Sequence, residues 1–254
     1  MALSDFSERY SRQMIFPFIG RYGQEKLRTA SVAIVGQGAL GTACASYLAR
    51  AGVGRLILID DDHIELSNLQ RQTLFTESDI GRNKAQAAAS HLREINSSIC
   101  IDAISFCLTE QNAEELLGDA QLVLDATDNF AARITINSFC VPRLIPWIYA
   151  GVVKGNGMTL NILPGGPCFR CLMPEDPDPA DEYPIAGTTG ILSTTAPFLS
   201  ALQCTEAIKI LVHGSGHTSV RRTLFYFDLC ENIFEQTPVA RIPSCPVCGC
   251  QRRN

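Results

Sequence analysis

Apolar and polar residues follow two alternating patterns along the first 150 residues. Short runs of β-branched and other apolar residues predict buried strands, and longer alanine-rich segments between them predict helices. This alternation, from about residue 30 to 150, predicts a Rossmann-like α/β fold: a mainly parallel sheet with helices on both faces. We expect strands at Ser31–Val35, Arg55–Asp60, Gln121–Leu124 and Trp147–Val153, and helices at Ala39–Ala51 and Lys84–Ile95.

The pattern changes in the last third of the chain. Residues 173–184 hold four prolines and five carboxylates without Lys or Arg, so we expect an exposed, mobile loop over 173–190. A helix is expected at Ala196–Val212, followed by two antiparallel edge strands at Thr223–Asp228 and Ile233–Val239. We interpret 1–254 as a single domain, with an N-terminal arm (1–30), a nucleotide-binding part (31–165) and a C-terminal antiparallel extension (166–254).

Composition and charge exclude several classes of protein. The 26 acidic residues outnumber the 21 basic ones, for a net charge of −5, and no basic stripe indicates nucleic-acid binding. The chain begins Met-Ala-Leu-Ser-Asp-Phe, without the apolar segment of a signal peptide. The longest apolar stretch, Gly190–Val212, is interrupted by Gln203, Glu206 and Lys209, so we expect no membrane span and a soluble, cytoplasmic protein.

Four of the eleven cysteines form two CxxC pairs, Cys168/Cys171 and Cys245/Cys248. Two such pairs can supply four thiolates to one tetrahedral, structural zinc ion, although Cys250 could compete with Cys248. The alternative is a thioredoxin-like redox site, which usually uses one pair at a helix N-terminus. The remaining six cysteines stand singly in apolar surroundings, and we expect buried, reduced thiols at Cys44, Cys100, Cys107, Cys140, Cys204 and Cys230.

A glycine-rich loop, Gly36-Gln-Gly-Ala-Leu-Gly41, follows the first expected strand and opens a helix. Glycines at 36, 38 and 41 permit a tight turn and close approach of the backbone to a phosphate, and the helix N-terminus favours an anion. Asp60, 19 residues after Gly41, could accept a hydrogen bond from a ribose hydroxyl. The motif alone predicts an adenine nucleotide; glycines used only for packing are the alternative.

Further charged residues follow later strands at the same edge of the sheet. Arg71 and Lys84 could balance a polyphosphate, and Asp128 could hold a magnesium ion that bridges phosphate oxygens. Two cations and an acid at the phosphates favour cleavage of a triphosphate over a dinucleotide that is merely held. No catalytic histidine is required; we expect structural or surface roles for four isolated histidines, His63, His91, His213 and His217.

At these residues the sequence resembles the ThiF/MoeB/HesA family of bacterial ubiquitin-activating-like adenylyltransferases. The resemblance covers nearly the whole chain in family order. Its most specific parts are the string around Asn68–Gln72 and the paired CxxC motifs. The matching segments are Arg9–Gln13, Gly23–Leu27, the glycine loop, Leu66–Gln72, Leu124–Asn129, Cys168–Leu172, Leu202–Lys209 and Cys245–Gly249.

The resemblance implies ATP-dependent adenylation of the C-terminal glycine of a small β-grasp sulfur-carrier protein, which ends in Gly-Gly, with release of pyrophosphate and later use of a sulfur donor. It implies that 166–254 is a zinc-clipped, carrier-binding part and that the protein is a homodimer, in which Arg12 completes the partner subunit's site. The other implied roles are ribose binding by Asp60, phosphate binding by Arg71 and Lys84, magnesium binding by Asp128, and a pocket lined by Asn68 and Gln72.

The sequence departs from the family pattern in the loop after the first CxxC. Many relatives carry a cysteine there that forms a thioester or persulfide, and the matching residue here is Ala186. We therefore expect no covalent carrier intermediate at that position. Three alternatives remain: activation of a different peptide or carboxylate, a nicotinamide-dependent oxidoreductase, and a silent binding module. The thiamine and molybdopterin branches are hard to separate, with a weak preference for the thiamine branch.

Overall fold

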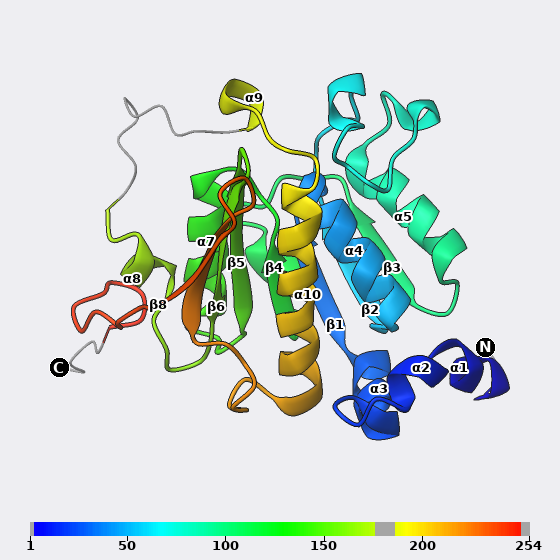
Figure 1. Ribbon diagram of the computed structural model, residues 1–254, viewed down its shortest axis with the longest axis horizontal. Helices are drawn as coiled ribbons and strands as arrows, with labels where there is room; N and C mark the ends of the chain where they lie inside the picture. Colours follow the sequence, from blue (N-terminus) through cyan, green and yellow to red (C-terminus); the bar gives the residue numbers. More distant parts are fainter. Residues whose placement is uncertain (1–2, 176–185, 250–254) are drawn as a thin grey trace.

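The structure is a computed structural model that describes residues 3–175 and 186–249. These residues form an eight-stranded sheet in the order β3-β2-β1-β4-β5-β6-β7-β8 (Figure 1). The five strands from β3 to β5 are parallel, and β6 to β8 continue the sheet antiparallel to their neighbours. The strands are β1 (Ser31–Val35), β2 (Arg55–Ile59), β3 (Cys100–Ile104), β4 (Leu122–Asp125), β5 (Trp147–Val153), β6 (Asn156–Ile162), β7 (Thr223–Asp228) and β8 (Ile233–Pro238).

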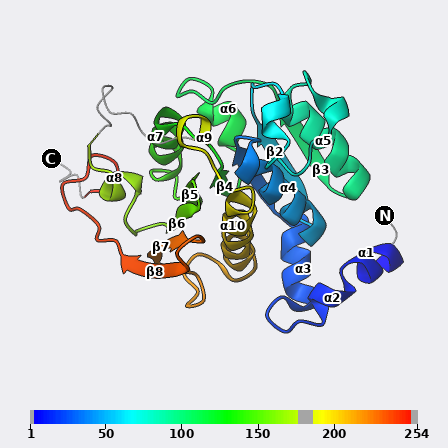
Figure 2. The same cartoon turned by 45° about the horizontal axis from the view of Figure 1, so that its top comes forward.

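Helices cover both faces of the sheet, and Figure 2 shows β4 and β5 between α10 and α7. One core lies beneath α4, α5 and α10, and the other beneath α6, α7 and α8. The larger helices are α3 (Gly20–Thr29), α4 (Ala39–Ala51), α5 (Lys84–Ile95), α7 (Phe130–Cys140) and α10 (Thr195–His213). The shorter ones are α1 (Leu3–Arg9), α2 (Ser11–Met14), η1 (Leu66–Asn68), η2 (Glu77–Asp79), α6 (Ala113–Leu117), α8 (Phe169–Leu172) and α9 (Ala186–Thr189).

The continuous apolar runs of the parallel strands follow from burial on both faces. In β1, Val32 and Ile34 pack into the core beneath α4 and α10, whereas Ala33 and Val35 pack into the opposite core. The predicted mainly parallel α/β fold with an antiparallel extension is therefore confirmed. Five predicted elements match the observed bounds: β1, α4, α5, β5 and β7.

The prediction that residues 223–228 form an edge strand is wrong. β7 lies inside the sheet and pairs with both β6 and β8, so in the described structure β8 and β3 are the edges. The error arose because β6, with Asn156, Gly157 and Asn161 among its residues, was not predicted as a strand. The polar Asn161 of β6 is buried, and its side chain donates a hydrogen bond to Glu206 Oε2 at 2.7 Å.

Two predictions about isolated side chains are also wrong in part. Cys44, Cys140 and Cys204 are buried as predicted, but Cys100, Cys107 and Cys230 are exposed; Cys100 begins an edge strand, and the other two lie outside helices and strands. The histidines are not all isolated. The rings of His213 and His217 stack at 4.6 Å, and His91 Nε2 lies 2.7 Å from Asp79 Oδ2.

The predicted loop over 173–190 falls largely on residues 176–185, which lie outside the described residues. Ala186 begins the short helix α9. No helix among the described residues is long and apolar enough to cross a membrane.

Candidate active site

The glycine loop joins β1 to α4 at the carboxyl edge of the parallel strands. Gly36 adopts φ +90°, and a Cβ on Gly41 would lie 1.9 Å from the carbonyl oxygen of Gly36, so both positions require glycine. Gly38 is the N-cap of α4 and provides no side-chain cap. The first N–H groups of α4 therefore remain available for an anion, as a phosphate-binding loop requires.

Asp60 follows β2 and fastens the glycine loop. Its Oδ2 accepts from Gln37 N at 2.5 Å, and its Oδ1 accepts from Asp62 N at 2.8 Å. Burial raises the pKa of Asp60, while the hydrogen bond from Gln37 and the charge of Lys84 oppose the rise. Each carboxylate oxygen has a second lone pair, so the predicted ribose contact remains compatible with this arrangement.

Lys84 is brought to the same turn by the start of α5. Asn83 caps this helix, because its Oδ1 accepts from Gln86 N at 3.1 Å, and its Nδ2 donates to the carbonyl oxygen of Asp60 at 3.0 Å. The Lys84 side chain is 10% exposed, and its Nζ lies 2.7 Å from Oδ2 of the exposed Asp62. Asn83 was missed by the sequence analysis, although an Asn before an alanine-rich segment is a recognisable N-cap signal.

The segment around η1 supplies the other predicted pocket residues. Asn68 Oδ1 accepts from Glu65 N at 3.0 Å, so Asn68 stabilises the turn itself. Gln72 is buried, its Oε1 has no hydrogen-bond partner among the described residues, and its Nε2 lies 3.9 Å from the place where a Cβ of Gly38 would stand. Gln72 thus faces the glycine loop with an unused acceptor. Arg71, half-buried, donates from Nη1 to the carbonyl oxygen of Ser67 at 3.0 Å.

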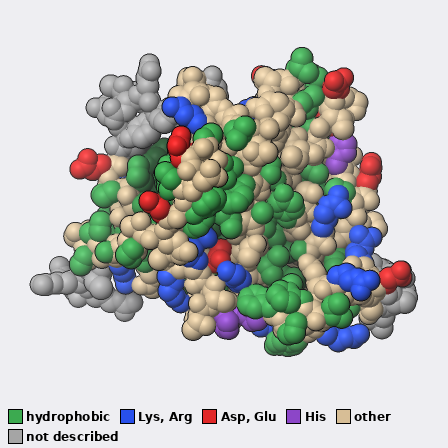
Figure 3. Space-filling view, viewed as in Figure 1, with side chains coloured by type: hydrophobic (Ala, Val, Ile, Leu, Met, Phe, Trp, Pro, Cys, Tyr) green, Lys and Arg blue, Asp and Glu red, His purple; other side chains and the backbone are tan. Residues whose placement is uncertain are grey.

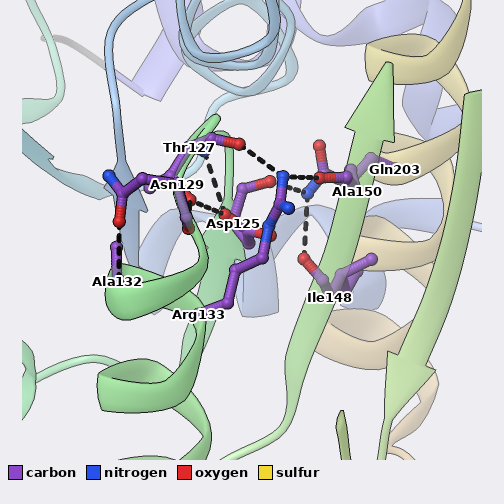
Figure 4. A network of polar contacts seen from close by, with 8 residues as sticks. All are labelled: Asp125, Thr127, Asn129, Ala132, Arg133, Ile148, Ala150 and Gln203. Atoms are coloured by element: carbon purple, nitrogen blue, oxygen red, sulfur yellow. Dashed lines mark hydrogen bonds and ion pairs between the residues drawn. The ribbon is translucent and has the colours of Figure 1, made fainter. Parts of the chain in front are cut away.

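The turn after β4 is held by a buried ion pair (Figure 4). Asp125 is fully buried; its Oδ1 accepts from the amide and hydroxyl of Thr127, and its Oδ2 lies 3.1 Å from Arg133 Nε. Arg133 reaches back from α7 and donates from Nη2 to the carbonyl oxygen of Thr127 at 2.7 Å. Burial raises the pKa of Asp125, while the charge of Arg133 opposes the rise.

Asp128 is the exposed member of this turn. Asn129 caps α7 by accepting from Ala132 N at 2.8 Å, and Gln203 of α10 donates to the carbonyl oxygens of Asp125 and Ile148. These contacts fix the backbone on both sides of Asp128. Its own carboxylate is exposed to solvent and forms no hydrogen bond or ion pair with the described residues. A rigid turn with one exposed carboxylate suits a hard cation such as magnesium.

Arg12 does not join the other predicted residues within one chain. It lies exposed on α2, beside α3 at the end of the sheet where β1 begins (Figure 1), whereas the glycine loop follows the other end of β1. This position agrees with a role in a partner subunit's site, which remains a prediction.

The four CxxC sulfurs meet in one buried cluster, with every pair of Sγ atoms within 4.8 Å. The Sγ atoms of Cys168 and Cys245 are 3.5 Å apart, and those of Cys171 and Cys248 are 3.3 Å apart. Tetrahedral Zn–S bonds of about 2.3 Å give sulfur separations of about 3.8 Å, so the cluster fits a zinc ion after a small expansion. Ile242 N also donates to Cys171 Sγ at 3.4 Å, a contact that stabilises a thiolate.

Changing Cys171 to Ser is expected to abolish stoichiometric zinc, because three thiolates leave the tetrahedral site incomplete. Metal analysis of the purified protein should give about one zinc per wild-type chain and far less in the variant. Cys140→Ser, which changes a buried cysteine outside the cluster, should keep its zinc. Wild-type protein that folds without zinc, with the four cysteines as two disulfides, would contradict the assignment.

Comparison with known proteins places the chain in a family. The model of the ThiF family matches residues 10–247. The SAMP-activating enzyme E1 of Haloferax volcanii is 38% identical over 242 residues, which cover 95% of this chain and 88% of that protein. The sulfur carrier protein ThiS adenylyltransferase of Escherichia coli (strain K12) is 40% identical over 243 residues, which cover 95% of this chain and 94% of that protein.

Solved structures agree with this fold. The microcin C7 biosynthetic enzyme MccB in complex with N-formylated MccA has a TM-score of 0.83 at 26% identity, covering 97% of this chain and 77% of that chain. Escherichia coli MccB with ATP has a TM-score of 0.80 at 27% identity, covering 95% and 74%. The chain therefore belongs to the ThiF family, and like the adenylyltransferases of that family it is a nucleotidyltransferase.

Proposed function

We propose that this protein uses ATP to adenylate the C-terminal glycine carboxylate of a small β-grasp sulfur-carrier protein, with release of pyrophosphate. The observation that carries the proposal is the meeting of the α4 N-terminus, Asp60 and the nearly buried Lys84 at one edge of the sheet. The relatives supply the substrate class: two are named for the carrier ThiS, and one activates SAMP.

In this proposal the loop Gly36–Gly41 and the first turn of α4 bind the phosphates, and Asp60 accepts from the ribose. Lys84 and Arg71 stabilise the charge that develops on the α-phosphate and the leaving pyrophosphate. Asp128 would hold a magnesium ion, which would neutralise phosphate oxygens when bound. Arg12 completes the site of the partner subunit in a homodimer. An external sulfur donor then acts on the acyl-adenylate, since Ala186 provides no thiol.

A second candidate substrate is the C-terminal carboxylate of a peptide other than a sulfur carrier. The match to MccB bound to N-formylated MccA favours it. The sulfur carrier is the stronger candidate because the curated carrier-activating relatives share 38–40% identity with this chain, against 26–28% for the MccB structures.

ATP–pyrophosphate exchange tests the proposal. Exchange should appear on addition of a ThiS-like protein that ends in Gly-Gly and should disappear when its last glycine is removed, because the acyl group is then misplaced at the α-phosphate. Exchange with an unrelated peptide, but not with carriers of the thiamine or molybdopterin type, would favour the second candidate. Absence of exchange with every carboxylate, in protein that is folded and zinc-loaded, would refute both.

A further inference from the structure

A pocket with several charged side chains lies far from the glycine loop, between α10 and the start of β7. Its volume is about 550 Å³. Figure 3 shows basic side chains gathered on this face, beside the lower half of α10. The N-terminal residue of α10, Thr195, contacts the carbonyl oxygen of Lys154 just after β5. Lys209 lies fourteen residues further along α10, about 21 Å at 1.5 Å per residue, so the pocket and the nucleotide site occupy opposite ends of the sheet.

The pocket carries an excess of positive charge. Three cations line it, Lys209, Arg221 and Arg222, against one acid, Glu206. The carboxylate of Glu206 already has hydrogen-bond partners. Its oxygens accept from Lys209 Nζ at 2.6 Å, from Asn161 Nδ2 at 2.7 Å and from the backbone N of Arg221 at 2.9 Å. Arg222 donates from Nη2 to a backbone carbonyl, that of Ser215.

Arg221 is the cation without a partner. No hydrogen bond or ion pair to its guanidinium is formed by the residues that the structure describes, and its Nε and Nη2 are buried without an acceptor. Burial lowers the pKa of Arg221, although the charge of Glu206 opposes this. The guanidinium lies over the ring of Phe225, at 5.4 Å from the ring centroid, but that contact satisfies none of its N–H donors. An unpaired, desolvated cation is unfavourable.

The two buried donors are the pair that binds oxyanions best. Nε–H and Nη2–H lie on one edge of the planar guanidinium and can donate in parallel to two oxygens of one anion. In the structure both nitrogens are buried, so binding of a ligand in the pocket requires a rotation about the last side-chain torsions that turns this edge outward. The hydroxyl of Thr218 also lines the pocket and can donate to a third oxygen. The other two hydroxyls of the lining already have partners, since Thr205 donates to the carbonyl oxygen of Ala201 and Ser219 pairs with His217 Nδ1.

We propose that this pocket is an oxyanion site for the phosphate group of a small ligand, separate from the nucleotide site and independent of the proposed reaction. The excess of two positive charges on the lining matches a phosphate dianion. The Nε–Nη2 edge and the Thr218 hydroxyl offer donors to three oxygens, one more than a carboxylate has. The site completes the hydrogen bonds that Arg221 lacks in the protein alone.

Calorimetric titration with inorganic phosphate tests the proposal, with acetate as a second probe. The wild type and Lys84→Gln, which alters only the nucleotide site, should bind phosphate at this pocket with equal affinity. Arg221→Gln should bind phosphate at least tenfold more weakly than the wild type. Arg221→Lys keeps the charge but not the two parallel N–H donors, so its affinity should lie between those of the wild type and Arg221→Gln. Three results would overturn the proposal: no phosphate binding to the wild type, loss of phosphate binding in Lys84→Gln instead of Arg221→Gln, or acetate binding as tight as that of phosphate.

Thermal unfolding provides a check on folding of the variants. Arg221→Gln removes an unpaired cation, so in phosphate-free buffer it should unfold at the wild-type temperature or above. Phosphate should raise the unfolding temperature of the wild type and of Lys84→Gln by more than that of Arg221→Gln, in which only the glycine loop remains to bind it, because a ligand that binds the folded state stabilises it. An equal rise in Arg221→Gln would place the phosphate elsewhere and contradict the proposal.

Discussion

Replacing Arg133 by Gln is expected to lower the free energy of unfolding by about 3–5 kcal/mol, since it leaves a buried carboxylate without its counter-charge. Asp125 is fully buried, and Arg133 is its only ion-pair partner in the described structure. Without Arg133, only the hydrogen bonds from Thr127 oppose the effect of burial, which raises the pKa of Asp125 above its value in the unfolded chain. The variant should therefore be least destabilised below about pH 4, where the carboxyl is neutral in both states, and lose stability as the pH rises.

Urea unfolding at several pH values measures this effect. The double variant Arg133→Gln/Asp125→Asn removes both charges and should recover much of the loss. Arg143→Gln is the matched control on the same side of the sheet. It breaks the exposed pair between Arg143 and Glu114 and should cost about 1 kcal/mol or less. A midpoint for Arg133→Gln equal to that of the control at neutral pH would show that the buried pair contributes no more than a surface pair.

The parallel part of the fold could be predicted because burial on both faces gives a clear signal. Runs such as Ser31–Val35 and Trp147–Val153 are apolar at nearly every position. They can be identified as strands without knowing how each strand pairs or which of its side chains point to each face of the sheet. β3 (Cys100–Ile104) lies at the edge and contains Asp102, which pairs with Arg55 at 2.7 Å. β6 buries Asn161 against Glu206. In both strands the polar residue has a hydrogen-bond partner distant in sequence, which a local pattern does not reveal.

The candidate site was predictable to the extent that strand ends meet. Gly36, Asp60 and Asp128 each follow a parallel strand, and the topology alone brings such residues to one edge. The sequence did not show which acid of the turn Asp125–Asn129 is structural. Asp125 is buried and paired, while Asp128 is exposed, and the difference depends on an arginine eight residues further on. Helix α7 was not predicted, so the return of Arg133 to the strand end was missed.

The cysteines show both what the sequence could predict and what it could not. The two CxxC motifs are 73 residues apart between Cys171 and Cys245, but their spacing and chemistry identified one cluster, because a four-thiolate site needs two such turns. The single cysteines lacked such a second signal. Exposure of Cys100 and Cys230 depends on which strands form the edges and turns, and this is a property of the assembled sheet.

Replacing Lys84 by Gln is expected to lower the rate of carrier-dependent ATP–pyrophosphate exchange by about 10²–10³-fold, equivalent to about 2.7–4 kcal/mol of transition-state stabilisation. The Lys84 side chain is 10% exposed, and its ammonium group is held beside Asp60 and Asp62, so its position is fixed before the nucleotide binds. The loss should appear mainly in kcat, because the charge that Lys84 would neutralise is largest while pyrophosphate departs. Folding should change little, since its partner Asp62 is exposed.

Lys26→Gln is the matched control. The Nζ of Lys26 donates to the carbonyl oxygen of Val212, between α3 and the end of α10. The same change of charge is therefore made far from the glycine loop and should leave the exchange rate within about twofold of the wild type.

Asp128→Asn should weaken activation by magnesium, and its exchange rate should recover at high magnesium, whereas that of Lys84→Gln should not. Equal exchange rates in Lys84→Gln and Lys26→Gln would remove Lys84 from the phosphate site. The α4 N-terminus and Arg71 would then have to carry the phosphate charge, and a group of the partner subunit such as Arg12 would become the first cation to test.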